Sequence, residues 1–184
     1  MIGDAAGPDG NGDAAEADRG VGARDRAAVA AQLGRVPRAT RAVADRCPCG
    51  LPDVVETSPR LADGAPFPTL YYLTCPRASS AVGRLEASGV MREMSDRLGA
   101  DPGLAAAYRA AHEAYLARRG ELGDVPEIAG VSAGGMPTRV KCLHALLAHA
   151  LATGPGVNPF GDEVRAALGE WWAAGPCVSV EESR

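Results

Sequence analysis

The stretch at residues 138–151 constrains the fold most, because it is the most apolar helix candidate in the chain. Projected at about 100° per residue, it carries apolar side chains on nearly every side, as a buried helix does. His144 falls within a leucine-rich stripe, whereas Cys142 and His149 fall on roughly the opposite side. Thr138 is expected to cap the start, and a Gly-Pro pair marks the end. We therefore expect one central buried helix.

Three short extended segments precede this helix, at residues 40–47, 53–57 and 69–74. Short connections containing Pro and Gly join them, which favours an antiparallel meander. The other expected helices lie at residues 24–33, 79–88, 90–98, 101–119 and 162–172, the last of them capped by Asp162. This order predicts an α+β fold in which a small antiparallel three-stranded sheet packs against about five helices.

The length of 184 residues fits a single domain with tails. Residues 1–24 are rich in Gly and Ala and carry five acidic against two basic side chains, so we expect a disordered acidic tail. Residues 25–175 form the expected globular domain, and residues 176–184 a loose C-terminal tail. Aromatic residues make up only 4% of the chain, so Ala, Val and Leu must build most of the core.

The charge and the hydropathy of the chain argue against two classes of function, nucleic-acid binding and a role within a membrane. The formal net charge of −4 lies mostly in the N-terminal tail, and no basic region indicates nucleic-acid binding. No segment approaches the roughly 18 apolar residues of a membrane helix, and no signal-peptide layout is present. We therefore expect a cytoplasmic protein with no nucleic-acid or membrane partner, and leave a protein partner open. Its five cysteines are then thiols or metal ligands.

The meander brings cysteines together, because the end of its first strand and the end of its third strand lie at the same edge of the sheet. Cys47, Cys49 and Cys75 meet there, and Cys142 and His144 join them if the central helix begins beside that edge. These five side chains are candidate ligands for zinc or an iron–sulfur cluster. On a regular helix Cys142 and His144 would point about 200° apart, so Cys142 can share a metal with His144 only from a non-helical cap.

Other interpretations stay open. The cysteines can be buried core thiols, with His144 a hydrogen-bonded core histidine, or the thiol-rich site can be redox-active. Gly134, Gly135, Arg139 and Lys141 precede or begin the central helix and could hold a phosphate or another anion. A non-catalytic adaptor is a further alternative, with the adjacent tryptophans 171 and 172 on the last helix as its anchor. Whether the protein is an enzyme stays undecided.

Several longer phrases resemble the domain of unknown function 501 (DUF501) family of actinobacterial proteins. They are RCPCGLP at 46–52, VVET at 54–57, PFPTLYYLTCP at 66–76, VKCLHA at 140–145 and NP at 158–159. The resemblance runs from about residue 36 to about residue 175.

The family's motif cysteines and histidines correspond to Cys47, Cys75, Cys142, His144 and His149. Many members carry a further histidine where this chain has a leucine, at position 146. The resemblance implies no particular activity. Family members are often encoded near a septum-formation initiator and an exopolyphosphatase-type enzyme, which implies an association with cell division or phosphate metabolism.

Overall fold

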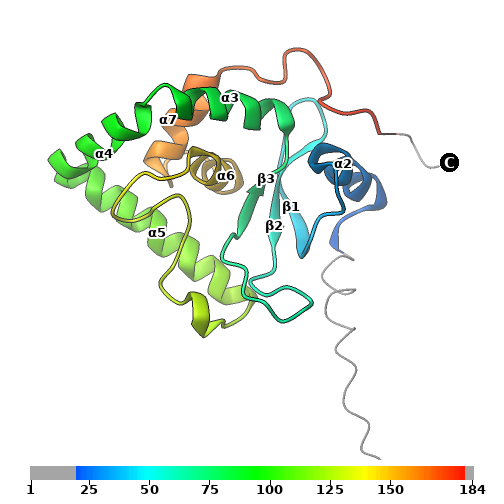
Figure 1. Cartoon of the computed structure of the whole chain (residues 1–184), viewed down its shortest axis with the longest axis horizontal. Coiled ribbons are helices and arrows are strands. Elements are labelled where there is room, and N and C mark those ends of the chain that lie inside the picture. The colour runs from blue at the N-terminus through cyan, green and yellow to red at the C-terminus, as the bar shows by residue number, and fades with distance from the viewer. Residues whose placement is uncertain (1–19, 181–184) are drawn as a thin grey trace, which may run out of the picture.

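The structure, a computed structural model, describes residues 20–180 and confirms the α+β class. Most of the predicted N-terminal tail and residues 181–184 of the C-terminal tail lie outside the described residues. The described elements include six α-helices and three strands (Figure 1). The helices are α2 (Ala23–Leu33), α3 (Pro76–Ala87), α4 (Val90–Ala100), α5 (Pro102–Leu122), α6 (Leu143–Thr153) and α7 (Pro159–Leu168), with a short 3-10 helix η2 (Pro126–Ile128).

The sheet is the predicted antiparallel meander, with strand order β1-β2-β3. Its strands are β1 (Thr40–Arg46), β2 (Pro52–Thr57) and β3 (Tyr71–Leu73). Val55 of β2 pairs with Val43 of β1 and Tyr72 of β3. All six residues of β2 are buried, because β2 lies between the other strands and both faces of the sheet are covered.

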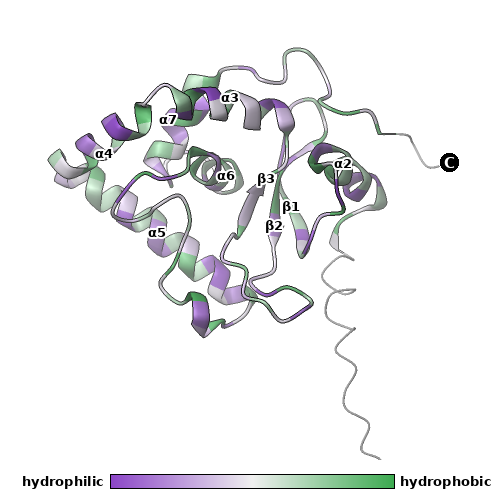
Figure 2. Ribbon diagram, viewed as in Figure 1, coloured by the Kyte–Doolittle hydropathy of each residue, from purple (hydrophilic) through white to green (hydrophobic). Residues whose placement is uncertain are grey.

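Helix α6 is the central buried helix that the sequence predicts. It lies between the sheet and helices α3, α5 and α7, while α2 covers the other face of the sheet (Figure 1). Its leucines and alanines make it the most uniformly apolar helix of the fold (Figure 2). Leu143, Leu146 and Leu147 are fully buried, and with Phe160 of α7 and Tyr108 of α5 they belong to one hydrophobic core.

The start of α6 differs from the prediction. The helix begins at Leu143 with Cys142 as its N-cap, so Thr138 does not cap it. A turn at residues 134–138 and an irregular segment at 139–142 precede the helix, and the carbonyl of Gly134 accepts hydrogen bonds from the backbone N–H groups of Lys141, at 2.7 Å, and Cys142, at 3.3 Å. Gly134 has φ 67°, a left-handed conformation that favours glycine.

The start of α7 also differs. Asn158 is the N-cap, and its side-chain oxygen accepts a hydrogen bond from the Gly161 N–H at 3.0 Å. Asp162 is therefore not the cap, and its carboxylate accepts instead from the Gly156 N–H at 2.8 Å. Because α7 ends at Leu168, Trp171 and Trp172 lie in the turn that follows rather than on the helix as predicted.

Helices α6 and α7 approach each other closely at Gly161. A Cβ atom at this position would lie 2.3 Å from the carbonyl oxygen of Leu146 and 2.6 Å from Cβ of Ala150. Only glycine allows the two backbones this separation.

Within residues 20–180, no helix combines the length and the apolar character that crossing a membrane requires.

Candidate metal centre

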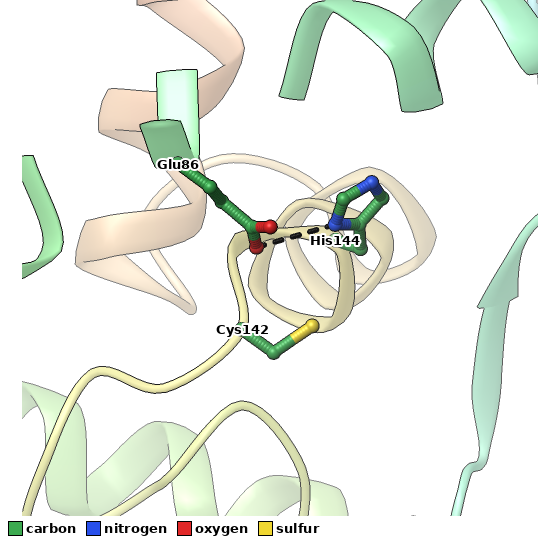
Figure 3. A group of neighbouring side chains, drawn as sticks. All are labelled: Glu86, Cys142 and His144. Carbon is green, nitrogen blue, oxygen red and sulfur yellow. Dashed lines mark hydrogen bonds and ion pairs between the residues drawn. The ribbon is translucent and has the colours of Figure 1, made fainter. Parts of the chain in front are cut away.

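One group of potential metal ligands stands out among the described residues, and it consists of Glu86, Cys142 and His144. One ligand atom from each side chain lies within 4.8 Å of the other two. Glu86 extends from the last turn of α3, whereas Cys142 and His144 come from the start of α6 (Figure 3). All three are partly exposed, so solvent reaches the group.

Cys142 can join His144 because it lies outside the regular helix. As the N-cap of α6 it has extended backbone angles, φ −149° and ψ 108°. The 200° separation that a continuous helix would impose on the two side chains does not apply at a cap. The condition that the sequence set for these two residues to share a metal is therefore met.

The two ring nitrogens of His144 have different partners. Nε2 lies 3.1 Å from the carbonyl oxygen of Ser79, which can only accept, so Nε2 carries the hydrogen of this bond. Nδ1 lies 3.2 Å from Oε1 of Glu86. Because a carboxylate only accepts, this contact is a hydrogen bond only while Nδ1 also carries a proton, and without that proton Nδ1 presents its lone pair toward Glu86 and Cys142. Metal-binding histidines are commonly oriented in this way, with one N–H fixed on a carbonyl.

Glu86 is held at the start of α6 by the helix itself. Its Oε1 atom also accepts a hydrogen bond from the backbone N–H of Leu143 at 2.7 Å. This N–H is one of those left free at a helix start, where a negative charge is also favoured by the helix dipole. The carboxylate of α3 thus fixes the two helices against each other at the candidate site.

Glu86 could not be recognised as a candidate ligand from the sequence, because no local pattern connects it to residues 56 and 58 positions later. One signal was available. Glu86 lies in the last turn of α3, where the helix dipole disfavours a negative charge. An acidic residue in such a position indicates a partner outside its own helix, which here is the start of α6.

The hydrogen bonds of His144 argue against a nucleophilic cysteine triad. A triad needs one histidine nitrogen on the thiol and the other on the carboxylate. Here the carboxylate of Glu86 lies on Nδ1, the same side of the ring as Cys142, and Nε2 is bonded to the Ser79 carbonyl, so no carboxylate orients the imidazole from the side opposite the thiol.

The other predicted ligands lie apart from this group. Cys47 and Cys49 lie in the turn between β1 and β2, and Cys75 is the N-cap of α3 after β3. The three cysteines therefore come after the ends of β1 and β3, which lie at the same edge of the antiparallel sheet. None of the three belongs to a group of three ligands among the described residues.

Burial makes two of these thiols poor thiolates. It raises the pKa of Cys47 to about 12, against the lowering effect of a hydrogen bond from the Cys49 backbone, and the side chains of Cys49 and Asp53 raise the pKa further. Burial raises the pKa of Cys75 to about 11, with a further contribution from Cys177. Their positions match the interpretation of buried core thiols better than that of redox-active ones.

The helical projection placed His144 in the apolar stripe and His149 on roughly the opposite side, and the structure gives these two histidines of α6 the reverse environments. His149 is fully buried and stacks on Tyr71 with 5.7 Å between ring centroids, whereas His144 is partly exposed. The assignment of His144 to the core stripe was therefore wrong. A helix apolar all round offers no polar face to fix its rotation, and α3 and the sheet, which pack against it, are distant in sequence.

The predicted anion cradle is not at a helix start. Arg139 and Lys141 lie in the irregular segment before α6, and the Leu143 N–H is already bonded to Glu86. A Cβ atom on Gly134 would lie 2.4 Å from the side chain of Leu146, and one on Gly135 would lie 2.5 Å from the Arg139 carbonyl. Close packing therefore explains both glycines.

Beside Cys47, a buried carboxyl group makes stability depend on pH. Asp53 is fully buried, and neither of its carboxyl oxygens has a hydrogen-bond partner among the described residues. Burial raises the pKa of Asp53 to about 8, and the negative charge of Asp45 raises it further. Above about pH 4 the unfolded state releases a proton that the folded state keeps on Asp53. The free energy of unfolding therefore decreases as the pH rises from about 4 toward 8.

We expect Asp53→Asn to gain stability relative to the parent as pH rises from 5 to 9, because the amide cannot ionise. Urea unfolding at both pH values measures the difference. Asp124→Asn changes an exposed carboxyl group and should show no such trend. A parent–variant difference for Asp53→Asn that is equal at pH 5 and 9 would contradict the assignment.

The family model described as "Protein of unknown function (DUF501)" matches residues 43–166, about two thirds of the chain. This range includes all three residues of the candidate metal centre. No curated protein and no solved structure matches the chain.

Proposed function

The chain belongs to the DUF501 family, and we propose that it binds one zinc ion through Glu86, Cys142 and His144. The observation that carries the proposal is the orientation of His144. Its Nε2–H is fixed on the Ser79 carbonyl, so that Nδ1 faces the carboxylate of Glu86, with the thiol of Cys142 close by.

The distances and the ligand types suit zinc. Ligands at about 2.0–2.3 Å from a tetrahedral ion lie about 3.3–3.8 Å from one another. The 3.2 Å between His144 Nδ1 and Glu86 Oε1 is close to this separation. One thiol, one imidazole and one carboxylate favour zinc over an iron–sulfur cluster, which needs mostly cysteine ligands. The hydrogen bond from Leu143 to Glu86 would support the carboxylate ligand from outside.

Three protein ligands leave the fourth position of a tetrahedral ion open. This coordination is typical of catalytic zinc, whereas structural sites are closed by four protein ligands. Side-chain exposures of 32% for His144 and 24% for Glu86 leave room for water or a substrate to reach that position. When bound, the ion would supply Lewis-acid chemistry there. A free thiol ligand also needs a reducing environment, so the proposal includes a cytoplasmic location.

The test is metal content and metal affinity of the full chain, purified without a polyhistidine tag. We expect about one equivalent of zinc per chain, and a thiolate-to-metal charge-transfer band when cobalt(II) replaces zinc. Cys142→Ser should abolish this band and weaken zinc binding at least about 100-fold, more than the loss of a supporting hydrogen bond costs. Competition with a chromophoric chelator measures the affinity.

Cys49→Ser is the matched control, because it removes a partly exposed thiol outside the group. It should leave both the band and the affinity unchanged. The zinc proposal fails if the parent binds less than about a tenth of an equivalent under anaerobic conditions. It also fails if Cys49→Ser abolishes the cobalt band and Cys142→Ser does not.

A further inference from the structure

A cavity of about 280 Å³ lies on the α2 side of the sheet, on the face opposite α6. Its apolar walls come from the end of α2, the sheet and the segment between β2 and β3. The apolar side chains that line it are Leu33, Pro37, Val55, Leu61, Phe67 and Tyr72. The volume is near the lower end of the range of about 300–1,000 Å³ for small-molecule sites, so a ligand here would be small.

One polar group in this cavity has no partner. Thr40 is only 3% exposed and lines the cavity, and its hydroxyl oxygen has no hydrogen-bond partner among the described residues. A buried hydroxyl without a partner has lost its hydrogen bonds to water and gained none in return. The hydroxyl is therefore available to bond a polar atom of a molecule in the cavity.

Positive charge dominates the rim. Arg35 and Arg38 both line the cavity and are exposed. The only hydrogen bond that the described structure gives Arg35 is a long one, 3.4 Å, to the carbonyl oxygen of Val36. Arg38 pairs with Asp63 at 3.0 Å, and both side chains of this pair are more than half exposed. Two guanidinium groups against one carboxylate favour a negatively charged ligand.

The backbone at this place is strained. Ala39, between Arg38 and Thr40, has φ 57°, a left-handed conformation that costs an alanine energy. It is the single non-glycine residue with positive φ among those that the structure describes. Strain of this kind concentrates at ligand sites, where it fixes the direction of neighbouring side chains.

We propose that this cavity binds a small amphipathic anion, with an aromatic or branched apolar body and one anionic head. The body lies against Phe67 and Tyr72, and the head lies at the rim between Arg35 and Arg38. The Thr40 hydroxyl donates a hydrogen bond to the head or to a polar atom next to it. The site is on the other face of the sheet from Glu86, Cys142 and His144, so it does not depend on the zinc proposal.

Two fluorescent probes of nearly equal shape test the proposal on the full chain. They are 8-anilinonaphthalene-1-sulfonate, which is an anion, and N-phenyl-1-naphthylamine, which lacks the sulfonate and is neutral. We expect one molecule of the anionic probe to bind per chain, at least about tenfold more tightly than the neutral probe. The double variant Arg35→Gln/Arg38→Gln should weaken binding of the anionic probe about tenfold and leave the neutral probe unchanged.

Asp63→Asn gives a result of opposite sign. Removing this carboxylate frees Arg38, so the anionic probe should bind more tightly to Asp63→Asn than to the parent. The control for net charge is Arg92→Gln/Arg109→Gln, which removes two exposed arginines on α4 and α5, away from the cavity. This control should bind the anionic probe as the parent does.

The cavity itself is tested by Leu61→Trp, which fills it, after circular dichroism has shown that the variant folds. Loss of both probes is expected. The proposal is overturned if the neutral probe binds the parent as tightly as the anionic one. It is also overturned if the charge control weakens binding as much as Arg35→Gln/Arg38→Gln does, or if a folded Leu61→Trp protein binds the anionic probe fully.

Discussion

Gly161→Ala is expected to lower the free energy of unfolding by about 3 kcal/mol, near the upper end of the usual cost of overpacking. The added Cβ would lie 2.3 Å from the carbonyl oxygen of Leu146 and 2.6 Å from Cβ of Ala150. Both atoms belong to α6, so no flexible side chain can move aside, and α7 itself must shift. Chemical denaturation followed by far-ultraviolet circular dichroism measures the loss.

Gly83→Ala is the matched control for Gly161→Ala. Gly83 lies within α3, and a Cβ atom there would meet nothing within 4 Å. Alanine is the better helix former by about 1 kcal/mol, so this substitution should be neutral or stabilising. Equal effects of the two substitutions would mean that the close approach of α6 and α7 does not contribute to stability as the structure indicates.

Acidification from pH 6.5 to pH 4 is expected to remove up to about 3 kcal/mol of stability that depends on neutral His149. Burial lowers the pKa of His149 from 6.5 to about 4. Between these values the unfolded state takes up a proton that the folded state does not. The contribution is therefore complete above pH 6.5, and it is lost as the pH falls to about 4.

His149→Phe isolates this contribution. It keeps an aromatic ring against Tyr71 and Tyr115, but it removes the acceptor of the 3.1 Å hydrogen bond from Asn158. Phenylalanine should be destabilising at pH 7, and its disadvantage should shrink as the pH falls to 4. Because Asp53 contributes a slope of opposite sign over this range, the difference between parent and variant is the informative quantity.

Urea midpoints at pH 4.5, 5.5 and 7 provide the measurement for His149→Phe. His112→Gln is the comparison, because burial lowers the pKa of His112 as well, but by less. Its difference from the parent should change less with pH. A constant difference for His149→Phe across the three pH values would show that folding does not change the pKa of His149, and would contradict this prediction.

The sheet and the burial of α6 could be predicted because both depend on local patterns. Short β-branched and aromatic segments with Pro-Gly connections define the meander, and an apolar stretch between glycine signals defines a buried helix. The same patterns placed Cys142 and His144 near a junction of elements. They also gave the condition, a non-helical Cys142, under which these two side chains can share a metal.

The features that could not be predicted from the sequence depend on contacts between segments that are distant along the chain. The start of α6 depends on hydrogen bonds to Gly134, and the rotation of α6 depends on its packing against α3, α7 and the sheet. Glu86 enters the candidate centre only because α3 docks its last turn on the start of α6. The cavity beside Thr40 is lined by α2, the sheet and the loop after β2, so no pattern within one segment of the sequence predicts it.

The central strand β2 sets a limit on how this protein can change over evolutionary time. Substitutions accumulate most freely where a side chain faces solvent, and β2 offers no such position, since all six of its residues are buried. Three of the six, Asp53, Glu56 and Thr57, are polar and also lack exposure. A change on one face of β2 meets α6 and its core, and a change on the other meets α2 or the cavity. In a library of all single substitutions we therefore expect β2 to be among the least tolerant segments, and its variation to arise mainly together with changes in both covering layers.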